Sequence, residues 1–313
     1  MAAQSQATRL PQPGRRVSLK TRETLAGLAF ISPWFLGFLI FTAGPMVVSL
    51  YLSFTNYDVI NPPRFIGLAN YHQLLVDPKV GLSLVNSIIY ALLFVPISTV
   101  VALALALILH RVGRAAGFFR TAFYLPSITP AVAVGTLWLW ILNPRVGLVN
   151  RGLELLGIAG PGWTTDSAWI KPGIVLMSVW GVGSTVIIYL AALRNVPIEL
   201  YEAANIDGAN GWQQLINITL PMISPAIFFT IIVNTIAALQ VFDQVYTMYF
   251  GTMASGPAST AALFYNIYLF QQAFQFLHMG FASAMAWLLF VIILILTLIQ
   301  LSVGNRFVYY EDS

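Results

Sequence analysis

The residues that most often carry chemistry are few and widely separated in this sequence. The three histidines, His72, His110 and His278, fit no metal-ligand spacing, and no cysteine is present to act as a nucleophile or thiolate ligand. No lysine stands in the Gly-x-x-x-x-Gly-Lys-Ser/Thr context of a phosphate-binding loop. The sequence therefore predicts neither an ATPase nor a membrane-embedded enzyme, with no catalytic residues and no metal or cofactor of its own.

One polar stretch between two apolar segments is patterned for local structure. Pro197 suits the start of a helix, and Glu202 follows early in it, where an acid suits the helix dipole. Asp207 and Gly208 form a turn or helix-stop signal. A second short helix is then expected, ending at Pro221, so the stretch predicts a helix–turn–helix.

The composition of the whole chain indicates that lipid is its solvent. Of its 313 residues, 58% are hydrophobic and only 8% are charged, whereas soluble domains carry about 25% charged residues. A membrane helix needs roughly 20 apolar residues. Six stretches without Asp, Glu, Lys or Arg qualify and predict an all-α membrane domain over residues 25–303, with spans at 25–52, 82–109, 121–142, 172–193, 222–242 and 279–303.

The distribution of Lys and Arg predicts the orientation of these spans. Ten of the 15 lie on the side of the N-terminal tail (1–24), the loop 194–221 and the C-terminal tail (304–313). The excess places both termini and that loop in the cytoplasm. A seventh span is not expected, so the apolar segment 258–270 is interpreted as an external or interfacial helix.

The polar stretch also matches a known motif. Glu202, Ala203 and Ala204 are followed by Gly208, and an Ile-x-Leu-Pro run ends at Pro221, nineteen positions after the glutamate. This spacing resembles the EAA motif of permease subunits of binding-protein-dependent ABC importers.

Further matches extend this resemblance over most of the chain. Asp-Gly-Ala at 207–209 is similar to the carbohydrate branch, which includes the maltose and glycerol-3-phosphate permeases. The other matching segments are Ser32-Pro33-Trp34, Gly44-Pro45, 65–71, Asn86-Ser87, 119–126, 242–246 and 280–284. One segment departs from the family pattern: Met253-Ala-Ser-Gly-Pro257 replaces the usual Thr-x-Gly-Gly-Pro, which leaves that external loop and its contact with a binding protein open.

The resemblance implies a six-span, type I ABC importer permease fold and a coupling role for the cytoplasmic loop 194–221. In such permeases this loop seats in a cleft of the ATPase subunit. Glu202 would make the polar contact, the two alanines would allow close approach, and Gly208 would permit the turn. The coupling residues implied are Glu202, Ala203, Ala204, Asp207, Gly208, Leu220 and Pro221.

The solute pathway is expected beside the second, fourth and fifth spans. Sugars are held by planar amide or carboxylate hydrogen bonds and by stacking on aromatic rings. The candidate pathway residues are Asn86, Trp180, Ser184, Tyr189, Asn234, Gln240, Asp243 and Gln244. Hydrogen bonding between helices is the alternative role for several of them.

The family resemblance implies partners and a location. The partners are a second homologous permease, two ATP-binding subunits that carry ATP and Mg, an external solute-binding protein and the lipid bilayer, but no nucleic acid. The location is the bacterial or archaeal inner membrane, crossed several times. The alternative is a self-contained secondary carrier or facilitator, which would favour ionisable groups within the spans.

Overall fold

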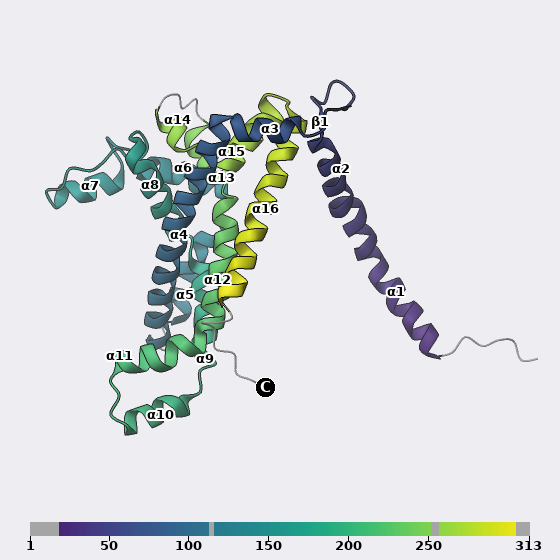
Figure 1. Ribbon diagram of the computed structural model, residues 1–313. Coiled ribbons are helices and arrows are strands. Elements are labelled where there is room, and N and C mark those ends of the chain that lie inside the picture. Colours follow the sequence, from purple (N-terminus) through teal and green to yellow (C-terminus); the bar gives the residue numbers. More distant parts are fainter. Residues whose placement is uncertain (1–18, 113–115, 252–256, 305–313) are drawn as a thin grey trace, which may run out of the picture. The chain divides into compact units, whose positions relative to one another are not determined.

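The computed structural model describes residues 19–112, 116–251 and 257–304. Helices dominate the described residues (Figure 1). Strands β1 (Thr55–Asn56) and β2 (Arg64–Phe65) form one short antiparallel hairpin. The chain divides into two units, residues 1–51 and 52–313, which are described separately.

The first unit is built around one long apolar helical run. Helix α1 (Leu19–Phe38) continues through a π-helical turn (Leu39–Ala43) into α2 (Gly44–Ser53), which extends just past the unit boundary. The wide turn accommodates Pro45, which has no N–H for the preceding turn. The run covers 35 residues. The predicted span 25–52 is thus present, but the helix begins at Leu19, within the expected tail 1–24.

The second unit is a helix bundle. Its long helices lie side by side in Figure 1, with α4 against both α9 and α12, and α12 against α16. Alanines on α4, Ala102 and Ala106, are fully buried in the same core cluster as Tyr189 and Leu190 of α9. Small residues allow membrane helices to approach closely. The bounds are α4 Pro78–Arg111, α9 Gly183–Arg194, α12 Leu220–Leu239 and α16 Met279–Gly304.

Two predicted spans are broken rather than straight. Helix α5 (Ala116–Tyr124) passes through a 3-10 turn (Leu125–Ile128) to α6 (Ala131–Ile141), with a bend of 100°. Thr129 is extended because the residue before a proline, here Pro130, disfavours helical geometry. The prediction of one span over 121–142 did not include this bend.

The fourth predicted span is bent as well. Helix α8 (Ser167–Trp180) begins before residue 172 and meets α9 at an angle of 51°, with the break at Gly181 and Val182. In the described part of the chain, four helical runs are long and apolar enough to span a membrane, and the count rises to six if each bent pair is one span.

Short helices gather at the end of the bundle opposite α10 (Ile198–Ile206) and α11 (Gly211–Gln214) (Figure 1). They include α3 (Ala69–Val76), α13 (Asp243–Tyr249), α14 (Pro257–Ala261) and α15 (Tyr265–Phe270). Between α6 and α8, the chain forms a further short helix, α7 (Leu148–Leu155).

The segment 258–270 is not a spanning helix, as expected, but it is also not one exposed interfacial helix. It forms α14 and α15, and its side chains from Ala261 to Ile267 are mostly buried in the core. Asn86 explains part of this burial, since its amide donates to the carbonyl oxygens of Thr260 and Leu263, each at 3.0 Å. Residues 253–256 of the atypical loop lie outside the described residues.

Candidate functional site

The loop 194–221, called the elbow below, is a preformed turn between two helices. Helix α10 (Ile198–Ile206) ends at Gly208, whose φ of 78° lies in the left-handed region that glycine tolerates. The N–H of Gly208 donates to the Asn205 carbonyl (3.1 Å), and that of Ala209 donates to the Ala204 carbonyl (2.8 Å). This pair of bonds is a Schellman motif, which satisfies the last carbonyls of the helix. The predicted turn at Asp207-Gly208 is confirmed.

The second arm of the elbow has its own start signal. The Asn210 side-chain oxygen accepts from the N–H groups of Trp212 and Gln213, at 3.0 and 2.9 Å. In the opposite direction, the Gln213 side-chain oxygen accepts a hydrogen bond from the Asn210 N–H at 2.7 Å. This capping box fixes the first turn of α11 (Gly211–Gln214).

Side chains then tie the two arms together. The Gln214 amide donates to the Asn205 side-chain oxygen at 2.7 Å and to the Ala209 carbonyl at 3.1 Å. The hydroxyls of Tyr201 and Thr219 are hydrogen-bonded at 2.9 Å. The elbow is therefore held at its tip by the turn and at its base by this hydroxyl pair.

The outer surface of the elbow is open. Glu202 and Ala203 are exposed and Ala204 is half-buried. Two large apolar side chains of the elbow are also highly exposed: Ile206 is 86% exposed, and Trp212, which borders a pocket between the elbow and the bundle, is 69% exposed. This surface combines a carboxylate, small residues and exposed apolar groups.

The connection from the elbow to α12 differs from the prediction. Pro221 does not end the second short helix, because α11 continues through a π-helical turn (Leu215–Thr219) directly into α12. The wide turn accommodates the proline ring and its missing N–H. The helical run therefore extends without interruption from Gly211 through Leu220 and Pro221, so that displacement of the elbow would act on α12 directly.

A cavity of about 510 Å³ lies where three helical runs are interrupted. Residues Pro126, Ser127 and Thr129 come from the α5–α6 bend, and Trp180, Gly181 and Ser184 come from the α8–α9 break. The third side runs from Gln240, just after α12, to Gln244 in the first turn of α13. Interrupted helices are tolerated in membranes where they line a cavity, and they leave backbone polar groups available to a solute.

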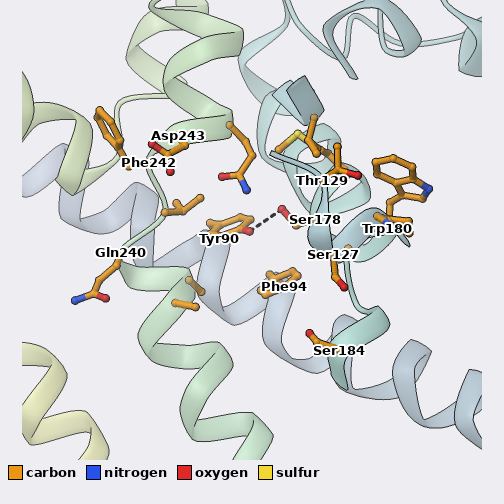
Figure 2. Close-up of a pocket in the computed structure, with 18 residues that line it drawn as sticks. Tyr90, Phe94, Ser127, Thr129, Ser178, Trp180, Ser184, Gln240, Phe242 and Asp243 are labelled. Atoms are coloured by element: carbon orange, nitrogen blue, oxygen red, sulfur yellow. Dashed lines mark hydrogen bonds between the residues drawn. The ribbon is translucent and has the colours of Figure 1, made fainter. Parts of the chain in front are cut away.

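The side chains around the cavity combine aromatic rings with small polar groups. Figure 2 shows Tyr90 and Phe94 of α4 between the side that carries Ser178 and Trp180 and the side that carries Gln240, Phe242 and Asp243. The Tyr90 hydroxyl donates to Ser178 at 2.8 Å, and the Tyr90 and Phe94 rings stack with centroids 5.5 Å apart. Among the described residues that line it, Asp243 is the only carboxylate and no Lys, Arg or His is present. The cavity can thus offer ring faces and hydrogen bonds to a solute.

The protein comparisons identify the family. Residues 84–309 match the family described as binding-protein-dependent transport system inner membrane component. This chain belongs to that family. The permease is 41% identical over 298 residues to the probable ABC transporter permease protein YesP of Bacillus subtilis, with 93% of this chain and 94% of that protein covered.

Two further similarities concern named solutes. The permease is 34% identical over 291 residues to the lactose transport system permease protein LacF of Rhizobium radiobacter, covering 91% of this chain and 96% of the relative. Its fold is similar to a chain in the crystal structure of a bacterial ABC transporter involved in the import of the acidic polysaccharide alginate. That match has a TM-score of 0.80 at 25% identity and covers 92% of this chain and 97% of the other.

The structure gathers five of the eight predicted pathway residues of the permease. These five line the cavity: Trp180, Ser184, Gln240, Asp243 and Gln244. Asn234 lies one helical turn before the cavity-lining Ala237 and Ala238, and its buried side-chain nitrogen has no hydrogen-bond partner among the described residues.

The other two predicted pathway residues lie elsewhere. Asn86 is buried against the α14–α15 connection, as described above. Tyr189 is fully buried in the α4–α9 core, with its hydroxyl bonded to Thr230. Both side chains are engaged in helix packing, which is the alternative role considered for this residue set.

Sequence reasoning missed part of the cavity wall. Tyr90, Phe94, Ser127, Thr129 and Ser178 line the cavity but were not among the predicted residues. A usable signal was present in the third span, where two prolines enclose Ser127 and Thr129 in an otherwise apolar stretch. Prolines close together mark a break, and a break exposes the polar residues beside it.

Proposed function

We propose that this permease moves a carbohydrate across a bacterial or archaeal inner membrane, driven by ATP hydrolysed on partner subunits. The observation that carries the proposal is the elbow: a rigid, solvent-facing pair of helical arms in continuous helical connection with α12, which borders the cavity. A docked ATPase subunit could therefore act on the solute pathway through α12 alone.

The elbow supports a coupling role through its residues. Glu202 offers a carboxylate to a partner, and Ala203 and Ala204 leave room for close approach. Asp207 and Gly208 set the angle between the arms, while Leu220 and Pro221 join the second arm to α12. Two such permeases, this chain and a homologous partner, would present one elbow each to two ATP-binding subunits, which bind the ATP and Mg. This chain would carry no catalytic residue.

The cavity supports a carbohydrate as the solute. Trp180 and Phe94 offer ring faces, and Ser184, Gln240 and Asp243 offer hydrogen bonds. Sugars present both apolar ring faces and hydroxyl groups, so they match this combination. A relative named for lactose and a structural neighbour named for alginate import support the same solute class. An external binding protein would deliver the sugar.

The proposal is tested by reconstitution. The chain would be purified with the proteins that co-purify with it, inserted in proteoliposomes and mixed with the cognate binding protein loaded with lactose, maltose or alginate oligosaccharide. We expect at least one loaded sugar to stimulate ATP hydrolysis and to accumulate inside. Sugar accumulation by this chain alone, without ATP, would instead establish a self-contained carrier.

A further inference from the structure

A second cavity, called the inner pocket below, lies between the elbow and the ends of the bundle helices. Its volume is about 680 Å³. Its walls come from the end of α4, the end of α9 and both arms of the elbow. Its lining includes the basic side chains Arg111, Arg194 and His110 and the aromatic side chains Tyr201 and Trp212.

The inner pocket carries positive charge without a matching acid. Arg111 and Arg194 end two different helices and are exposed, and neither guanidinium group has an ion pair or hydrogen bond with any described residue. No Asp or Glu is among the described lining residues, and Glu199 and Glu202 of α10 are not part of the wall. The two guanidinium groups therefore keep their hydrogen-bond donors free.

Helix dipoles reduce this charge but do not cancel it. Each helix C-terminus is equivalent to roughly half a negative elementary charge, which favours a cation there. Two helix ends thus offset about one of the two positive charges. About one positive charge is left facing the pocket, enough to favour a monoanion.

The remaining wall is suited to the interface between lipid and water. Trp212 is 69% exposed and Tyr201 is half-buried, and both residue types prefer the headgroup level of a membrane. Apolar side chains, Leu107, Leu193 and Leu215, complete the wall. The excess of Lys and Arg puts this end of the bundle at the cytoplasmic leaflet, whose anionic lipids bind basic pockets between helices.

We propose that the inner pocket binds a phosphate-bearing anion, held by Arg111 and Arg194, with the headgroup of an anionic phospholipid as its source. Guanidinium groups recognise phosphate oxygens through paired N–H donors. Because the pocket walls include the bundle ends and both elbow arms, the bound anion bridges them. The bound anion therefore restrains movement of the elbow relative to the bundle. The strength of this restraint depends on the anionic lipid content of the membrane.

The test is hydrogen–deuterium exchange of the elbow amides, residues 207–219, in the full transporter complex in nanodiscs. Three conditions are compared: phosphatidylcholine alone, phosphatidylcholine with phosphatidylglycerol, and phosphatidylcholine with added inorganic phosphate at equal ionic strength. We expect phosphatidylglycerol to slow elbow exchange several-fold in the wild type. The double variant Arg111→Gln/Arg194→Gln should lose this protection, and Arg111→Lys/Arg194→Lys should keep only part of it, because lysine retains the charge but not the paired donors.

The control variant is Arg22→Gln, which removes one positive charge from α1, a helix that contributes no residue to the pocket lining. It should keep the protection. Arginine-dependent protection by inorganic phosphate alone would support the site with free phosphate as its source. The proposal is overturned if neither addition slows exchange, if the glutamine pair behaves as wild type, or if Arg22→Gln loses as much protection as that pair.

Discussion

Trp180 occupies the corner of the cavity where α8 ends. Its ring meets that of Trp138 edge-on, with centroids 6.0 Å apart, and the residue is 40% exposed and lines the cavity. Aromatic contacts of this kind contribute about 0.5–1.5 kcal/mol each. The geometry suits a ring face offered to a passing sugar.

We expect Trp180→Ala to lower sugar uptake roughly two- to tenfold, the range that this contact energy converts to. ATP hydrolysis stimulated by the loaded binding protein should persist, because the elbow is untouched. Uptake and hydrolysis would be measured in the same proteoliposomes. Trp140→Ala is the matched control, since Trp140 is 78% exposed and does not line this cavity. Equal uptake in the two variants would argue against Trp180 as a pathway residue.

Gly280 is a residue whose role is steric. It is the second residue of α16 and lies beside the hairpin, and a Cβ added there would collide with the carbonyl oxygen of Thr55. The Asn70 amide donates to that same carbonyl and to that of Ser53, each at 2.8 Å, so the backbone cannot move without loosening these bonds.

Gly280→Ala should therefore destabilise the protein by about 1–3 kcal/mol, the usual cost of overpacking. Gly81→Ala in α4 is the control: no atom outside its own helix lies within 4 Å of the added Cβ, and alanine favours helix by about 0.5–1 kcal/mol. Thermal unfolding of the solubilised protein would compare the two. A melting temperature for Gly280→Ala equal to that of Gly81→Ala would show that α16 and the hairpin are not in tight contact.

At the scale of elements, the elbow depends on one backbone conformation. The Schellman motif at the end of α10 needs the left-handed φ of Gly208, which costs a residue with a Cβ about 1–2 kcal/mol. Gly208→Val should reduce the population of the correctly shaped elbow roughly 5- to 30-fold. The amount of ATPase subunit retained on the purified permease should fall accordingly.

Gly211→Val provides the comparison for this change. Gly211 has no positive φ, and a Cβ there meets no atom within 4 Å, so ATPase retention should stay close to wild type. Retention that drops equally in both variants would point to the added bulk on the elbow surface rather than to the turn.

Helices and turns could be predicted from the sequence where a local sequence pattern determines them. The apolar runs of α4, α12 and α16 needed only length and hydropathy, and the elbow turn needed only Asp207 and Gly208. The 100° bend between α5 and α6 was not predicted, although Pro126 and Pro130 mark it, because membrane helices often contain proline without breaking. The burial of α14 and α15 depends on Asn86, a partner more than 170 residues away. A contact over this sequence distance cannot be predicted from a local sequence pattern.

The site was predictable to a similar degree. The elbow residues follow from a motif of fixed spacing, and five cavity residues follow from polar groups near span ends. The cavity itself arises because three breaks in α5–α6, α8–α9 and α12–α13 meet at one place. Such a meeting is a property of the packed bundle, so Tyr90 and Ser178, which lie inside apolar runs, could not be assigned to it in advance.

At the scale of the whole molecule, the chain has a cavity and an elbow joined by α12, the proposed solute site and the proposed docking site, while its sequence contains no phosphate-binding loop. The six predicted spans also contain no Asp, Glu, Lys or Arg that could couple transport to protons or sodium. The account therefore requires that force enters through the elbow.

The most direct test of that requirement is ATP-driven sugar uptake by the reconstituted complex with Glu202→Arg in this chain, compared with Glu199→Arg. Both acids are exposed on α10, but only Glu202 belongs to the motif. The account predicts that Glu202→Arg lowers uptake at least tenfold, about 1.4 kcal/mol or more of lost coupling, while Glu199→Arg stays near wild type. Undiminished uptake with Glu202→Arg would contradict it.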